Sequence, residues 1–306
     1  MKTLATTVRN SDSALPASVT RAAVLAVAVR AADLVTEMQR AGLREVKTKG
    51  VATDLVTEAD VASERLIRAA LHDLDPGIAF WGEESNRRPA EDAFWLVDPI
   101  DGTVNFAHGL TYSAVNIALN LGGATVLGVT VQMPYRRVYW AERGQGAFLQ
   151  EPGGAPQRLR VSAVATLGGA FLATGFPYHS GQSVDNNDAE FVHFSPRCMG
   201  MRVLGAGALD IAQVAAGMLA GFWEGWLNPW DAAAGALMVR EAGGRVSDYA
   251  GNEWHFDAPG LIASNGHIHN LLLEGIHTAR AALPERLLPV EAVGGRVTLA
   301  GRRVGE

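Results

Sequence analysis

The sequence predicts an α+β protein, a layered sandwich that contains a largely antiparallel sheet. Apolar residues recur at helical spacing in two N-terminal stretches, 18–40 and 57–74. From 112 to 149 the pattern changes to alternating or continuous apolar runs, separated by turns that contain glycine or proline, which is typical of an antiparallel meander. Mixed strands and helices follow. Helices and sheets in this order are expected to bury their apolar faces as a layered sandwich.

Residues that end helices follow both predicted N-terminal helices. Gly42 follows the first predicted helix, and Asp75-Pro76-Gly77 ends the second. The second helix opens with Thr57-Glu-Ala-Asp60, which resembles a capping box. A polar connection is expected over 46–54. Predicted strands cover 78–81, 94–97, 112–121, 125–133, 137–141 and 146–149.

The second half mixes short strands with helices. Predicted strands cover 158–161, 170–174, 201–204 and 222–226, with two more near Val246 and Leu261; predicted helices cover 184–194, 206–217, 229–242 and 267–283. We expect a flexible N-terminus (1–17), an N-terminal subdomain (18–155), a C-terminal subdomain (156–283) and a C-terminal tail (284–306). In that tail, 290–304 forms either a hairpin or a loose segment.

Composition narrows the class of protein. A chain of 306 residues with 48% hydrophobic content can bury a sizeable core. Its 26 basic and 32 acidic residues give a net charge of −6, which argues against non-specific nucleic-acid binding. Cys198 is the only cysteine, so no intrachain disulfide can form and a reducing cytoplasm is the simplest setting. No run reaches the roughly 18 apolar residues of a membrane span.

The stretch 94–106 reads Phe-Trp-Leu-Val-Asp-Pro-Ile-Asp-Gly-Thr-Val-Asn-Phe and carries the main chemical signal. A short buried strand delivers Asp98 and Asp101. Pro99 forces the chain out of the strand, and Gly102 permits a tight turn close to a ligand. Carboxylate oxygens suit a hard cation. The free N–H groups of Gly102 and Thr103, before a short helix near Val104, suit a phosphate.

Two further acidic stretches raise the significance of this motif. They are Gly82-Glu83-Glu84-Ser85 and Trp230-Asp231-Ala-Ala-Ala-Gly235. Taken singly, the three stretches fit a β-turn, a solvated loop and a helix N-terminal acid. Together, they would gather carboxylates that repel one another without a cation. The sequence therefore predicts a metal site.

The three motifs, in this order, resemble those of the inositol monophosphatase family, whose members are Mg²⁺-dependent, lithium-sensitive phosphomonoesterases. The resemblance runs from about residue 20 to about 281. It implies an α/β/α/β/α sandwich with the site between two subdomains, two or three Mg²⁺ ions and a homodimer. It also implies that the ligands are the side chains of Glu83, Asp98, Asp101 and Asp231 and the carbonyl of Ile100.

The resemblance further implies a reaction and its residues. Phosphate sits on the N–H groups of Gly102 and Thr103, and a metal-activated water attacks in line. Thr103 orients that water, Asp54 accepts a hydrogen bond from the Thr103 hydroxyl, and Glu83 shares in catalysis. Asn105 is expected to hold the loop.

A small phosphate monoester is the implied substrate, with myo-inositol monophosphate first. Glu224 matches the glutamate with which this family binds substrate hydroxyls. The rest of the implied pocket is formed by Gly205, Ala206, Gly207, Asp101 and Asp231. Histidinol phosphate, fructose 1,6-bisphosphate and 3′-phosphoadenosine nucleotides remain alternatives. A non-enzymatic role as a partner of the transcription machinery or RNA is the alternative from another class.

Overall fold

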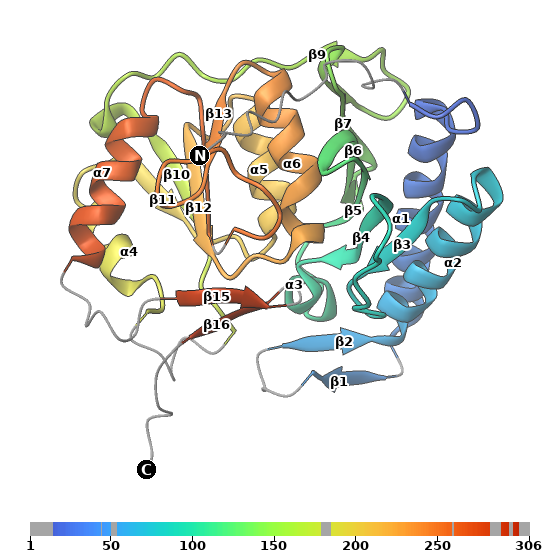
Figure 1. Cartoon of the computed structure of the whole chain (residues 1–306). Helices are drawn as coiled ribbons and strands as arrows, with labels where there is room; N and C mark the ends of the chain where they lie inside the picture. The colour runs from blue at the N-terminus through green and yellow to red at the C-terminus, as the bar shows by residue number, and fades with distance from the viewer. Residues whose placement is uncertain are drawn as a thin grey trace, which may run out of the picture.

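A computed structural model describes residues 15–43, 45–49, 54–178, 185–258, 260–281, 289–293 and 296–299. Helix pairs and sheets alternate in five layers, as Figure 1 shows from the α1–α2 pair to the α4–α7 pair. The α/β/α/β/α sandwich predicted from the sequence is confirmed. Within the described residues, no helix is long and apolar enough to cross a membrane.

A seven-stranded sheet forms the first β layer, in the order β3-β4-β5-β6-β7-β8-β9. All neighbours are antiparallel except β3 and β4, which run parallel. The strands are β3 (Ala79–Gly82), β4 (Ala93–Asp101), β5 (Ser113–Leu121), β6 (Ala124–Met133), β7 (Arg137–Glu142), β8 (Gly146–Gln150) and β9 (Gln157–Arg158). The predicted meander accounts for β5 to β8.

The helix pair α1 (Arg21–Ala41) and α2 (Glu58–Leu74) covers one face of this sheet. Thr20 caps α1, and Gly42 ends it at φ +89°, where glycine has no steric cost. Thr57 and Asp60 form the predicted capping box of α2. Both helices begin and end within a few residues of the predicted positions.

The pair α5 (Gly207–Ala215) and α6 (Pro229–Glu241) lies between the two sheets. Helix α6 is buried almost all round because it packs against both sheets. Small residues allow this close approach: a Cβ on Gly128 of β6 would lie 2.7 Å from the Cα of Ala234. This central layer brings the N-termini of both helices beside β4.

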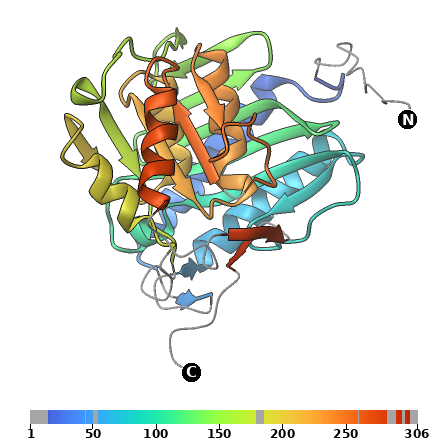
Figure 2. The same ribbon diagram turned by 60° about the vertical axis from the view of Figure 1, so that its left-hand side comes forward.

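A five-stranded sheet, ordered β11-β10-β12-β14-β13, forms the second β layer. Strand β10 runs parallel to both neighbours, and the remaining pairs are antiparallel. The helices α4 (Asp188–Phe194) and α7 (His269–Arg280) cover its outer face, with α7 in front of the sheet in Figure 2. The other bounds are β10 (Phe171–Thr174), β11 (Gly200–Arg202), β12 (Gly221–Gly225), β13 (Arg245–Ser247) and β14 (Gly260–Ser264), with a 3₁₀ turn at Leu167–Gly169 and helix α3 at Thr103–Ala107.

Three local features differ from the prediction or complete it. The connection expected over 46–54 contains β1 (Val46–Thr48), which pairs with β2 (Leu55–Thr57) as a hairpin. The strand expected over 158–161 is shorter and begins earlier: it is β9, which pairs with β8. This pairing crosses the proposed subdomain boundary at 155, and the division there stays a prediction. In the tail, β15 (Pro289–Val293) pairs with β16 (Arg296–Leu299), which resolves the open alternative in favour of a hairpin. The expected flexible segment 1–17 lies largely outside the described residues.

Candidate active site

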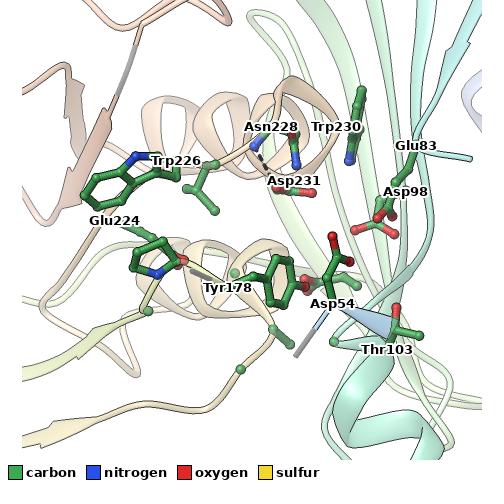
Figure 3. Close-up of a pocket in the computed structure, with 18 of the residues that line it drawn as sticks. Asp54, Glu83, Asp98, Thr103, Tyr178, Glu224, Trp226, Asn228, Trp230 and Asp231 are labelled. Carbon is green, nitrogen blue, oxygen red and sulfur yellow. Dashed lines mark hydrogen bonds between the residues drawn. The ribbon is translucent and has the colours of Figure 1, made fainter. Parts of the chain in front are cut away.

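A single pocket of about 600 Å³ collects the residues predicted for the site. It is lined by Asp54, Glu83, Asp98, Ile100, Asp101, Gly102, Thr103, Gly205, Ala206, Gly207, Glu224 and Asp231. Figure 3 shows Glu83 and Asp98 at one end, Glu224 and Trp226 at the other, and Tyr178 between them. We call the part formed by Glu83, Asp98, Asp101 and Asp231 the metal end, and the part formed by Gly175, Gly207, Glu224 and Trp226 the Glu224 end.

Strand β4 delivers the two aspartates of the central motif. Its pairing with β5 is regular up to Asp98 and irregular between Asp98 and Asp101, where Pro99 cannot donate to the ladder. The Ile100 N–H donates to Asp98 Oδ1 at 2.9 Å, and the Leu209 N–H donates to Asp101 Oδ2 at 3.0 Å. Asp101 thus meets the N-terminus of α5, where backbone donors and the helix dipole favour a carboxylate.

Helix α6 delivers the third aspartate. Pro229 occupies its first turn, and Asp231 accepts from the Asn228 N–H at 2.8 Å in a capping box. Asp231 is therefore both a helix N-terminal acid and a pocket residue. The capping bond fixes the side chain in a position where it lines the pocket.

The Gly82–Ser85 turn delivers Glu83 and is fixed by a residue that sequence reasoning missed. Glu64, on α2, accepts from the Glu84 N–H at 2.8 Å. Its carboxylate lies so close to Gly82 that a Cβ there would be 2.3 Å from Glu64 Oε2. Lys49, also missed, donates to Glu83 at 2.7 Å and to Glu84 at 2.6 Å. Its ammonium balances part of the negative charge at the metal end.

Electrostatics at the metal end favour bound positive charge. Burial, followed by repulsion from Glu83, raises the pKa of Asp98 and of Asp231 well above the usual range. Burial also raises the pKa of Asp101 to about 7, although backbone N–H groups oppose the shift. A cation would relieve this cost.

The donor set fits Mg²⁺ by its chemistry, since it combines carboxylates with the carbonyl of Ile100. Among the described residues, no three Asp, Glu, His or Cys side chains already form a group that could hold an ion. The four carboxylates therefore line one pocket without forming a closed set of ligands, and the metal site stays a prediction.

The structure gives Thr103 two partners, and the predicted hydrogen bond from Thr103 to Asp54 stays a prediction. Thr103 Oγ1 lies 2.9 Å from the carbonyl oxygen of Ile100 and 3.2 Å from Asp60 Oδ1. Asp60 is fully buried, and burial, offset in part by its bonds to Thr57, raises its pKa to about 6. Asp54 lines the same pocket, and its role there stays a prediction. The Thr57-x-x-Asp60 pattern revealed Asp60 only as a helix cap.

The Gly102 turn approaches the 205–207 segment closely. Gly102 has φ +77°, and a Cβ on it would lie 2.9 Å from the carbonyl oxygen of Gly205 and 3.0 Å from Cβ of Ala206. Conformation and space therefore both require glycine. Asn105 Nδ2 donates to the carbonyls of Tyr112 and Leu204, at 2.9 and 2.7 Å. These bonds agree with the expectation that Asn105 holds the loop.

The Glu224 end is built on the second sheet. Glu224 lies on β12, and its carboxylate sits directly over Gly175, where a Cβ would be 2.1 Å from Glu224 Oε2. Burial, followed by repulsion from Asp231, raises the pKa of Glu224 well above its usual range. Asp210, another buried pocket residue, accepts from the Tyr112 hydroxyl at 2.6 Å. Sequence reasoning missed Asp210 and Trp226, since neither belongs to a recognisable motif.

Comparisons with known proteins agree with this geometry. A family model described as "Inositol monophosphatase family" matches residues 15–283. An inositol-1-monophosphatase of Caulobacter vibrioides is 40% identical over 249 residues, covering 80% of this chain and 93% of the relative. The Nus factor SuhB of Pseudomonas aeruginosa is 39% identical over 264 residues, covering 83% and 95%. The solved structure of a Thermotoga maritima IMPase has a TM-score of 0.77 at 31% identity, covering 85% of this chain and 97% of that chain.

Proposed function

Since the chain belongs to the inositol monophosphatase family, we propose that it is a Mg²⁺-dependent phosphomonoesterase which hydrolyses myo-inositol monophosphate or a similar small monoester. One observation carries the proposal. The carboxylates of three separate motifs line one pocket together with Glu224 and with Thr103, whose hydroxyl contacts the buried Asp60. A metal-assisted hydrolysis needs these groups side by side: oxygen ligands, a positioned hydroxyl and a subsite for the alcohol.

The metal end would hold two or three Mg²⁺ ions on Glu83, Asp98, Asp101, Asp231 and the Ile100 carbonyl. When bound, Mg²⁺ supplies the charge that activates water and stabilises the departing oxygen. The N–H groups of Gly102 and Thr103 hold the phosphate at the start of α3. The Thr103 hydroxyl, fixed by Asp60 and Ile100, orients the attacking water. Most of the rate enhancement in such a reaction comes from positioning and charge.

The Glu224 end would hold the alcohol part of the substrate. Glu224 accepts hydrogen bonds from substrate hydroxyls. The absence of long side chains at Gly205, Ala206 and Gly207 leaves room for a polyol ring. Asp101 and Asp231, at the metal end, would bind the hydroxyls next to the phosphate.

A panel of phosphate-release assays tests the proposal. The substrates are myo-inositol 1-phosphate, histidinol phosphate, fructose 1,6-bisphosphate and 3′-phosphoadenosine 5′-phosphate, each with Mg²⁺ and with excess EDTA. We expect Mg²⁺-dependent release that is fastest from a small monoester. Release that is unchanged in EDTA, or no release from any of the four, would overturn it.

A binding role in transcription is a second candidate, because relatives at 36–39% identity carry the name Nus factor SuhB. The net charge of −6 supports a protein partner rather than direct RNA binding. Co-purification with RNA polymerase from a lysate of the source cell, by wild type and by a catalytically dead variant, tests this candidate.

The quaternary state and compartment are proposals of the same kind. The family membership supports a homodimer, which light scattering on the purified protein would test. A single cysteine supports a reducing cytoplasm, which cell fractionation would test.

A further inference from the structure

Trp226 combines a pocket position with an unusual backbone conformation. It follows β12 directly, two residues after Glu224, and its partly buried side chain lines the pocket. Its φ is +64°, in the left-handed region. In Figure 3 its indole lies at the end of the pocket away from Glu83 and Asp98.

A bulky side chain in this conformation needs an explanation. The left-handed region brings the Cβ of an L residue against the backbone, so glycine is the residue that adopts it without strain. Gly225 stands immediately before Trp226, so the chain already has a flexible residue at this corner. Strained residues of this kind concentrate at ligand-binding sites. The local backbone does not require a tryptophan, whereas the pocket gains an aromatic surface from it.

The Glu224 carboxylate lies at the same end of the pocket as the Trp226 indole. Gly175 and Gly207 have no side chains, and a Cβ on either would meet Glu224 Oε2, at 2.1 and 3.6 Å. The carboxylate therefore lies over the backbone of Gly175, and the indole is an aromatic surface at the same end of a pocket that Phe176, Tyr178 and Leu227 also line. A carboxylate next to an aromatic face suits a ring with hydroxyls on its rim and C–H groups on its face. The hydroxyls donate to the carboxylate, and the C–H face packs on the indole.

We propose that Trp226 is a specificity-determining residue which packs against a ring-shaped leaving group while Glu224 accepts a hydrogen bond from the same ring. The proposal rests on the proposed function, since it names the class of alcohol that the phosphatase releases. It predicts a preference for phosphate esters of cyclic polyols over those of acyclic polyols.

The test compares Trp226→Gly with wild type on myo-inositol 1-phosphate and glycerol 2-phosphate, both in Mg²⁺. Glycine suits φ +64°, so the variant should fold and its Tm should stay level or rise by about 1–4 °C. We expect KM for the cyclic ester to rise about 5- to 10-fold, with kcat little changed. Kinetics on the acyclic ester should change less than about 2-fold, and Trp226→Phe should recover part of the preference.

Arg136→Gly is the matched control. Arg136 also has a positive φ, of +57°, but lies in an exposed turn outside the pocket, so its replacement should leave both kinetic ratios unchanged. Equal losses on both esters, or no loss on either, would overturn the role of Trp226 while leaving the phosphatase intact. If wild type releases phosphate from neither ester, the proposed function itself fails. Calorimetric binding of myo-inositol 1-phosphate to wild type and Trp226→Gly then decides the role of Trp226, with unchanged affinity counting against it.

Discussion

The two ends of the pocket hold their acids in different ways. At the metal end, Asp98, Asp101 and Asp231 each accept a backbone N–H from a strand end or a helix start. At the Glu224 end, the described residues give the Glu224 carboxylate neither a hydrogen bond nor an ion pair, and only burial and repulsion act on it. The protein fixes the first set of carboxylates itself, whereas under our proposal a bound substrate supplies the partner of Glu224.

This difference separates two tasks. Backbone donors hold a side chain regardless of which alcohol is present, so the metal end is suited to the step that all phosphate esters share. A carboxylate without protein partners is costly to bury, and a substrate that donates to it recovers that cost. Changes at the metal end should therefore affect every ester, and changes at the Glu224 end should affect some esters and not others.

The sharpest test of the metal end is Asp98→Asn. Removing one carboxylate should lower phosphate release from every ester by more than about 10³-fold, because a metal ligand is lost. The raised pKa of Asp98 means that its ionised form is less stable in the folded chain than in the unfolded chain. At neutral pH the amide removes this cost, so Tm of the metal-free protein should stay level or rise.

Asp92→Asn, at an exposed position just before β4, is the control and should leave turnover unchanged. An Asp98→Asn variant that keeps activity on any ester, or wild-type turnover in excess EDTA, would contradict the metal end as described.

The Thr103–Asp60 pair gives the next largest effect. A group that orients the attacking water contributes about 10²–10⁴-fold, less than a metal ligand. Thr103→Ala and Asp60→Asn should each lower kcat by about that factor, and the double variant should be scarcely worse than the poorer single one. KM should move little, because the Thr103 N–H remains.

Asp54→Asn tests whether Asp60 or Asp54 is the carboxylate that acts with Thr103. Because the Thr103 hydroxyl contacts Asp60 at 3.2 Å, we expect the losses of Asp54→Asn and Thr103→Ala to multiply. If they fail to multiply while those of Asp60 and Thr103 do, the original assignment of Asp54 is restored.

Glu224→Ala tests the Glu224 end of the pocket. A carboxylate that accepts from substrate hydroxyls contributes about 1.5–3 kcal/mol, which corresponds to roughly 10- to 150-fold in kcat/KM. We expect a loss of that size on myo-inositol 1-phosphate and little loss on p-nitrophenyl phosphate. Similar losses on both substrates would make Glu224 a support of the metal end instead.

The sequence could predict the metal end because its residues lie in short motifs whose local geometry is nearly self-contained. Asp98-Pro99-Ile100-Asp101-Gly102 brings its own turn, and Asp231 brings its own helix start. The layered fold was predictable for a similar reason, since the helical and alternating periods are long and regular. The β1–β2 hairpin was not predicted, because β1 is exposed along its length and has no apolar alternation.

What the sequence could not supply are contacts between distant segments. Asp60 faces Thr103 across 43 positions, and a capping box explains Asp60 fully without that contact. Glu64 and Lys49 likewise gain their contacts from neighbours that no spacing rule connects. The resemblance helped with the motif residues and named Asp54, which lines the pocket and whose link to Thr103 stays a prediction.

The smallest expected effect comes from Gly175, and it tests the Glu224 end without touching an acid. No positive φ constrains Gly175, but a Cβ there would lie 2.1 Å from Glu224 Oε2. The carboxylate would have to move, which weakens its bond to the substrate without removing it. Gly175→Ala should therefore lower kcat/KM on myo-inositol 1-phosphate by about 3- to 30-fold and leave p-nitrophenyl phosphate almost unaffected. Gly168→Ala, with nothing within 4 Å, is the control. In a Glu224→Ala background the Gly175 substitution should cost nothing more. A further loss there would mean that Gly175 contacts the substrate itself, and that the floor of the Glu224 end is backbone rather than carboxylate.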